Sequence, residues 1–181
     1  MDRVIVTERL ELIPATSEMV RAALASGAAL SSSLGASVPP TWPPEFLDPP
    51  SLQFTLNRLA EGAENSEWWL YFVLLSPDGG ARTLIGSVGY KGPPSEDGTV
   101  EIGYGIVSDQ RRRGYASEAA RGLIARAFSV TTVRRVIAET YPELEGSIGV
   151  LRKCGFTFIG DGSEPCVIRF ELERPAYAMR T

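Results

Sequence analysis

The chain has 181 residues, a length that suits one domain over residues 1–181, and its 44% hydrophobic and 22% charged residues are typical of a globular protein. Its net charge of −4 argues against a nucleic-acid partner, because neutralising a phosphate backbone normally requires a broad basic face. No apolar run approaches the roughly 20 residues that cross a bilayer and the amino terminus lacks a secretion signal, so we expect no membrane partner and a cytoplasmic location.

The first part of the chain predicts a strand and then a helix. Residues 4–13 alternate in part between apolar and charged side chains, which is the period-two pattern of a half-buried strand, and Pro14 ends it. Thr16 or Ser17 can then cap a helix, because apolar residues recur near helical spacing as far as about Leu30.

Six of the thirteen prolines fall within residues 38–51, where they prevent regular hydrogen bonding and stiffen an extended loop. Such a loop is either a surface connector or a rigid wall of a substrate pocket, which Trp42 and Phe46 would then line. Ser51 is placed to cap a short helix with leucines at positions 52, 56 and 59.

The middle of the chain predicts three antiparallel strands in succession, over residues 68–75, 82–90 and 99–107, with turn signals at residues 77–80 and again before residue 99. The rest of the chain predicts a helix over residues 117–128, a strand over 134–139, a helix over 147–154, and two strands, one around residue 156 and one over 167–172. We therefore predict a mixed α/β or α+β sheet.

A basic cluster stands out in this acidic chain, in the stretch DQRRRGYASEAA (109–120). Gly114 allows a positive φ or a close approach to a ligand, and the residues after it supply the unpaired amides of a new helix. Such amides and the helix dipole attract anions, and the arginines before them complete a phosphate cradle. The alternative is a solvated surface loop, and the strand upstream favours the cradle.

Two glycines, Gly103 and Gly105, lie inside the predicted strand VEIGYGIV (100–107), where glycine weakens a strand unless a bulge or a close backbone approach requires it. A ligand with amide groups of its own can hydrogen-bond such an edge and leave its phosphates for the next loop. Coenzyme A has this anatomy, because its pantetheine amides are followed by a pyrophosphate.

Histidine is absent, which excludes nucleophiles activated by histidine and zinc ligated by histidine. Cys154 and Cys166 do not form a metal-binding motif, and we expect both to be buried thiols. The acidic residues around Glu143 and Glu145 lack metal-ligand partners as well. We therefore expect no metal.

Together these features resemble the GNAT acetyltransferase superfamily, and specifically its ribosomal-protein N-acetyltransferase-like branch. Residues 111–116, RRRGYA, match the superfamily motif Gln/Arg-x-x-Gly-x-Gly/Ala for acyl-CoA, and the following SEAA is similar to the branch's Thr/Ser-Glu-Ala. The resemblance spans nearly the whole chain, through residues 7–16, 84–92, 100–106 and 147–160. It implies a GNAT fold, whose mostly antiparallel central sheet is splayed at the cofactor site and flanked by helices, with acetyl-CoA as the acyl donor.

The resemblance implies three groups of cofactor-binding residues. The pyrophosphate is expected at main-chain amides that open a helix, namely those of Arg111, Arg112, Arg113, Gly114, Tyr115 and Ala116, with Ser117 extending the cradle. The pantetheine arm is expected at the strand before it, at Gly105, Ile106 and Val107. Ser147 is expected near the lower part of the cofactor.

Attack on a thioester requires a neutral amine, so a base must remove a proton. Glu101 resembles a glutamate proposed for this role in the family, and the alternative is that Glu101 pairs with a cation at the sheet edge. An amide of the strand, that of Ile106 or Val107, is expected to meet the negative charge that develops on the thioester oxygen.

Two positions depart from the family pattern. Leu144 stands where the branch commonly has asparagine, and Leu151 stands where many members have a tyrosine acid. Tyr141 and Cys154 are then the available general acids, and a leaving thiolate without assistance is the third possibility.

We therefore expect acetyl transfer from acetyl-CoA to a primary amine, either a protein N-terminal amine or a small-molecule amine. Direct attack is expected because the sequence shows no activated nucleophile for an acyl-enzyme. The alternative is a non-catalytic module that binds acyl-CoA as a sensor, which Leu144 and Leu151 favour. A monomer and a homodimer are both compatible with the sequence.

Overall fold

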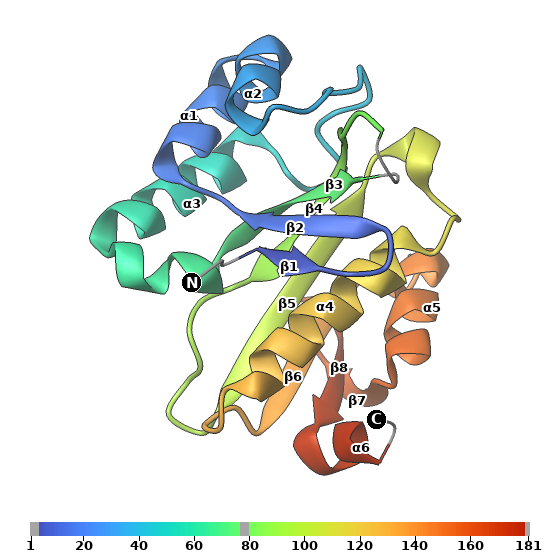
Figure 1. Ribbon diagram of the computed structural model, residues 1–181. Helices are drawn as coiled ribbons and strands as arrows, with labels where there is room; N and C mark the ends of the chain where they lie inside the picture. The colour runs from blue at the N-terminus through green and yellow to red at the C-terminus, as the bar shows by residue number, and fades with distance from the viewer. Residues whose placement is uncertain (1–3, 77–79, 180–181) are drawn as a thin grey trace.

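The computed structural model describes residues 4–76 and 80–179, which fold around one eight-stranded sheet with helices on both faces (Figure 1). The strand order is β1-β2-β3-β4-β5-β6-β8-β7, and β5 and β6 are the parallel pair in an otherwise antiparallel sheet. The strands are β1 Ile5–Val6, β2 Leu10–Pro14, β3 Leu70–Leu75, β4 Thr83–Tyr90, β5 Thr99–Ile106, β6 Arg135–Thr140, β7 Thr157–Asp161 and β8 Ile168–Glu173. This is the mixed, mostly antiparallel sheet that the sequence predicted.

Helices divide the core into two clusters. Residues of α4 and α5 pack on one face of the sheet, and residues of α1, α2 and α3 pack on the other face over β3 and β4. The helices are α1 Ser17–Ala25, α2 Gly27–Leu34, α3 Pro49–Glu61, α4 Tyr115–Ser129, α5 Glu145–Cys154 and α6 Arg174–Ala178, with short 3-10 turns at Ala63–Trp68 and Ser108–Gln110. None of the helices within the described ranges is long and apolar enough to cross a bilayer.

Three predictions for the amino-terminal part were wrong in detail. The strand predicted over residues 4–13 is a hairpin, in which Ile5 of β1 pairs with Leu12 of β2. The predicted helix to Leu30 is divided at Ser26, whose extended backbone ends α1 and whose side chain caps α2. The cap of α3 is Asp48 rather than Ser51, because the Asp48 carboxylate accepts the Ser51 amide and the prolines of the first turn need no partner there.

The three central strands pair antiparallel in sequence order, as predicted. The predicted turn at residues 77–80 falls mostly outside the described residues. Trp68 precedes β3 in a 3-10 turn and is buried against Tyr90. Cys154 is buried, but Cys166 is exposed, so the expectation of two buried thiols was wrong for Cys166.

The sheet opens where β5 leaves β6. Pairing of β5 with β4 continues to Ile106, whereas its pairing with β6 ends at Ile102, opposite Ala138. The last four residues of β5 therefore have a sheet neighbour on one side and a gap on the other. In Figure 1, α4 lies in front of β5 and β6, and the gap between these two strands positions the candidate site.

Candidate active site

The backbone of β5 presents hydrogen-bonding groups to the gap at alternate residues. The Val107 amide donates to the Ile85 carbonyl at 2.9 Å, and the Lys91 amide donates to the Glu101 carbonyl at 2.9 Å, so the odd-numbered residues of β5 face β4. Tyr104 and Ile106 consequently direct their main-chain groups into the gap. Of the two amides expected to meet a thioester oxygen, only that of Ile106 faces the gap.

The helix that follows begins with unpaired amides. Gly114 is the residue before α4 and has a φ of 83°, a left-handed conformation that favours glycine. No side chain caps this helix, and Glu118 is the first residue whose amide bonds back to the carbonyl of Gly114. The amides of Tyr115, Ala116 and Ser117 therefore form a donor set at the positive end of the helix dipole.

The far side of this loop is held by the amino-terminal hairpin. Glu118 accepts from the Thr7 hydroxyl at 2.6 Å and from the Arg9 amide at 2.7 Å, and it forms an ion pair with the Arg9 guanidinium at 2.7 Å. Burial alone would raise the pKa of Glu118, but these hydrogen bonds bring it below its ordinary value. Arg9 also donates to the Arg113 carbonyl and lies over the Tyr115 ring, so one ionic cluster fixes the loop before α4.

The three arginines have different environments. Arg111 is directed back to the strand, because its Nε donates to the Ile106 carbonyl at 3.0 Å and its guanidinium pairs with Glu45 at 3.2 Å. Arg112 has a φ of 61° and an exposed side chain beside the helix amides. Arg113 is exposed as well, and its guanidinium reaches the Asp109 carbonyl at 3.5 Å.

A cavity of about 1350 Å³ joins the gap to the start of α4. The loop of residues 38–51 walls it with Glu45, Phe46 and Leu47, which bears out the pocket-wall alternative. Pro44 lies against Gly105, where an added Cβ would be 3.2 Å from the Pro44 Cβ. The predicted role of Trp42 is not seen, because Trp42 packs on Phe72 in the core rather than lining this cavity.

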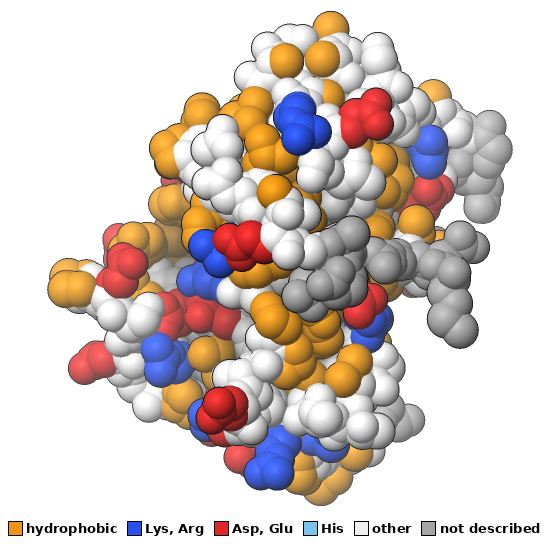
Figure 2. Space-filling view, turned by 90° about the vertical axis from the view of Figure 1, so that its left-hand side faces the viewer, with side chains coloured by type: hydrophobic (Ala, Val, Ile, Leu, Met, Phe, Trp, Pro, Cys, Tyr) orange, Lys and Arg blue, Asp and Glu red, His pale blue; other side chains and the backbone are white. Residues whose placement is uncertain are grey.

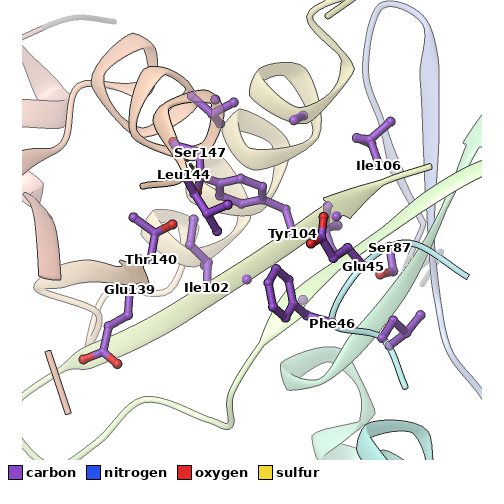
Figure 3. A pocket seen from close by; sticks show the side chains of 18 of the residues that line it. Glu45, Phe46, Ser87, Ile102, Tyr104, Ile106, Glu139, Thr140, Leu144 and Ser147 are labelled. Carbon is purple, nitrogen blue, oxygen red and sulfur yellow. Dashed lines mark hydrogen bonds between the residues drawn. The ribbon is translucent and has the colours of Figure 1, made fainter. Parts of the chain in front are cut away.

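The cavity contains a pair of hydroxyl groups: Ser147, which the sequence predicted near the cofactor, and Tyr104, which the sequence interpretation missed. The Tyr104 hydroxyl lies 3.1 Å from the Ser147 carbonyl and 3.2 Å from the Ser147 hydroxyl, which joins β5 to α5 across the gap (Figure 3). Burial raises the pKa of Tyr104 to about 12, so this hydroxyl stays protonated at neutral pH. Alternation along EIGYGIV, which puts Tyr104 on the opposite face from Gly103 and Gly105, was the available signal.

The remaining catalytic candidates are less favourably placed. Glu101 forms an ion pair with Lys91 and is not among the residues that line the cavity, so the structure shows the ion pair that was its alternative role. Tyr141 lines the cavity but stacks near Phe46. Cys154 is buried with its thiol near the Ser117 carbonyl, outside the cavity lining, and burial raises its pKa.

The two departures from the family pattern occupy different places. Leu144 lines the cavity beside Ser147 and Tyr104 (Figure 3), whereas Leu151 is buried in the core between α5 and the sheet. Neither side chain can exchange a proton.

These groups fit a phosphorylated thiol cofactor with amide groups. The open edge at Tyr104 and Ile106 offers both a donor and an acceptor to an extended arm, and the helix amides with Arg112 offer an anion site at its end. The cavity is larger than the roughly 300–1,000 Å³ of an ordinary ligand pocket, so it has room for a cofactor and a second substrate. Within the described parts of the chain, no group of three or more acidic or cysteine side chains is arranged to hold a metal ion.

Comparison with known proteins gives the same family as the resemblance in the sequence. The model of the acetyltransferase (GNAT) domain matches residues 9–157. An uncharacterized N-acetyltransferase, YjdG of Bacillus subtilis, is 41% identical over 73 residues, which are 40% of this chain and 44% of YjdG. The chain thus matches less than half the length of this curated relative.

Two solved structures share the fold over nearly the whole chain. The ribosomal-protein-S5-alanine acetyltransferase of Vibrio fischeri has a TM-score of 0.67 at 18% identity, and the match covers 94% of this chain and 96% of that one. The ribosomal L7/L12 α-N-protein acetyltransferase RimL, in complex with coenzyme A, has a TM-score of 0.65 at 17% identity and covers 96% and 99% of the two chains.

Proposed function

Because the chain belongs to the GNAT acetyltransferase family, we propose that it transfers an acetyl group from acetyl-CoA to a primary amine by direct attack. The observation that carries this proposal is the open edge of β5, which is followed directly by the uncapped start of α4. The S5-alanine and L7/L12 acetyltransferases are named for protein substrates, which makes a protein amine one acceptor to test.

Acetyl-CoA supplies the activated thioester, and residues of the chain bind and orient it. The amides of residues 112–117 and the side chain of Arg112 hold the pyrophosphate at the helix amino terminus, whereas the Arg111 amide, also predicted for this role, is directed to the Ser108 carbonyl at 3.5 Å. Tyr104 and Ile106 hydrogen-bond the pantetheine arm along the gap, and the Arg111 side chain must release the Ile106 carbonyl for the full set of these bonds to form. Gly105 lets the pantetheine arm approach the strand closely because it has no side chain. It makes no hydrogen bond to the arm, because its main-chain groups face β4.

The reaction forms a bond between the amine nitrogen and the acetyl carbon and breaks the bond between that carbon and sulfur. The Ile106 amide stabilises the negative charge that develops on the carbonyl oxygen, because its direction is fixed before the reaction. The proton of the amine passes to Glu101 through water, since the Glu101 carboxylate is held by Lys91 and does not line the cavity.

The sulfur leaves as a thiolate that accepts a hydrogen bond from the Ser147 hydroxyl. A tyrosine with a pKa of about 12 is a poor proton source for a thiolate, whose pKa is about 8.5 in a free cysteine. Tyr104 is therefore a positioning residue: its hydroxyl turns from the Ser147 carbonyl to donate to the Ser147 hydroxyl oxygen, which leaves the serine proton for the thiolate while Tyr104 keeps its own. The thiolate takes up its proton after it is released to solvent.

Thiol release from acetyl-CoA, measured with a panel of primary amines, tests the proposal. Amine-dependent release of the thiol together with the mass of an N-acetylated product is the expected result. Binding of acetyl-CoA without product across the whole panel would instead support the sensor module, which Leu144 and Leu151 favour.

A further inference from the structure

The acceptor side of the cavity combines small residues with exposed aromatic rings. We propose that it binds a primary amine carried on an aromatic or similarly flat, apolar group. The inference rests on the proposed acetyl transfer, because it names the acceptor class for that same site. Three features of the side of the sheet opposite α4 lead to it: an open floor, aromatic walls and carboxylates that are already paired.

The floor is built from residues with little or no side chain. Ser87 of β4 lies opposite Gly105 of β5, and Gly103 is the next residue of β5 on that face. A Cβ added at Gly103 would meet no atom within 4 Å, so the space in front of this residue is unfilled. Because Gly103 stands at the start of the gap, a flat group resting there would place an attached amine next to the proposed thioester position.

Aromatic rings border this space from two directions. Phe46 of the proline-rich loop lies with its ring centroid 6.1 Å from that of Tyr141, and Phe54 of α3 lies 6.0 Å from Trp69 in an edge-on arrangement. Figure 3 shows the Phe46 ring on the side of β5 opposite Tyr104.

A ligand that covers these rings would bind more tightly, because it would bury their exposed apolar surface. Phe46 is 66% exposed and Phe54 is 53% exposed, yet both line the same cavity. Exposed aromatic side chains that converge on one cavity indicate an apolar binding site, because a flat apolar ligand removes their faces from water and adds ring contacts. Neither ring is required to fill the core, since both remain outside the two clusters of buried residues.

The charges on this side are largely matched within the protein. Two carboxylates line this side, from the loop and from β6, and each has a cation of its own: Glu45 with Arg111 and Glu139 with Arg169. Glu101, which does not line the cavity, is paired with Lys91. Glu143 and Glu145 also line the cavity, but they are exposed at its rim, where solvent screens them. Acidic and basic side chains are also interspersed elsewhere on the surface, on the face at the left-hand side of Figure 1 (Figure 2). The acceptor site therefore offers a second ammonium group few carboxylates for an ion pair, which disfavours a polyamine as the acceptor.

An acceptor panel tests this inference. Phenethylamine and tryptamine are compared with propylamine, spermidine and two peptides, one with an amino-terminal serine and one with an amino-terminal phenylalanine. We expect kcat/KM for the free aromatic amines to exceed that for spermidine and the serine peptide by at least about 10-fold, the factor that 1.4 kcal/mol of binding gives. A higher value for the phenylalanine peptide than for phenethylamine would place the aromatic group on a protein rather than on a small molecule.

The same panel separates this inference from the proposed function. Efficient acetylation of spermidine or the serine peptide, with slower turnover of every aromatic substrate, would overturn the acceptor class and leave acetyl transfer intact. Absence of product from all amines, with acetyl-CoA bound, would overturn both.

Two variants locate the acceptor. Phe54→Ala removes an exposed ring, and we expect it to raise KM for phenethylamine about 3- to 10-fold, with KM for propylamine and the Kd of acetyl-CoA unchanged. Gly103→Val fills the space on the floor and should also raise KM for phenethylamine, while the strand keeps its bonds to β4. Phe158→Ala is the matched control, because Phe158 is a 57% exposed ring on the edge strand β7. An unchanged KM in both site variants would overturn the proposal.

Discussion

Substitution of Tyr104 by phenylalanine tests how the leaving sulfur is stabilised. The change removes the hydroxyl that lies 3.1 Å from the Ser147 carbonyl and 3.2 Å from the Ser147 hydroxyl, and leaves the half-buried ring in place. One neutral hydrogen bond contributes about 0.5–1.5 kcal/mol to stability, so we expect Tm to fall by about 1–6 °C.

The effect on turnover follows from the same bond. If Tyr104 orients Ser147 toward the thiolate, its loss reduces transition-state stabilisation by about 1.4 kcal/mol or less, which is roughly 10-fold in kcat. Burial raises the pKa of Tyr104 from 10.0 to about 12, so its protonated form is favoured in the folded protein. This contribution of Tyr104 to the free energy of unfolding is complete below pH 10 and is lost as the pH rises toward 12.

Thiol release under saturating amine and acetyl-CoA gives kcat, and calorimetry gives the Kd of acetyl-CoA, which should not change. Tyr177→Phe is the control, because Tyr177 stacks on Phe128 at the carboxyl-terminal end of the chain and does not line the cavity. A kcat equal to that of the wild type would refute the positioning role. A fall of 1,000-fold or more, with a changed alkaline limb of the pH profile, would refute it in favour of direct proton transfer from Tyr104.

Three further substitutions test the supports of the site. Glu118→Gln should destabilise the protein by about 1 kcal/mol near neutral pH by weakening the bonds to Arg9; because the pKa of Glu118 is lowered, this difference should vanish as the pH falls below 4.5, as monitored by thermal unfolding. Gly114→Ala should cost about 1–2 kcal/mol at a φ of 83° and weaken acetyl-CoA binding in calorimetry, and an unchanged Tm would contradict the strain argument. Glu101→Gln should lower kcat by about 100-fold without changing the Kd of acetyl-CoA, whereas unchanged turnover would assign Glu101 to its ion pair with Lys91 alone.

The cofactor end of the site was predictable because its determinants are local. Glycines within a strand, a glycine before a helix and adjacent arginines all lie within residues 103–114, and each has a backbone consequence that a single sequence shows. Even there, the direction of the amides depended on pairing with β4. The Val107 amide is used by Ile85, a partner more than 20 residues away in the sequence.

Contacts between distant segments account for the errors. The turn between β1 and β2 is stabilised by Glu118, which bonds Thr7 and Arg9 across more than 100 residues, so residues 4–13 carry little local signal for a hairpin. The bond between Tyr104 and Ser147 likewise depends on how α5 packs beside β5. Cys166 was assigned to the core from residue type alone, which does not determine the exposure of a single side chain.

The open edge of β5 and the start of α4 together bind acetyl-CoA in the proposed reaction, and every other proposed role follows from this binding. Isothermal titration of the intact chain with acetyl-CoA tests this directly. We predict a binding heat with one site per chain and a Kd in the micromolar range, weakened by the Gly114→Ala substitution. No heat with millimolar acetyl-CoA would contradict it.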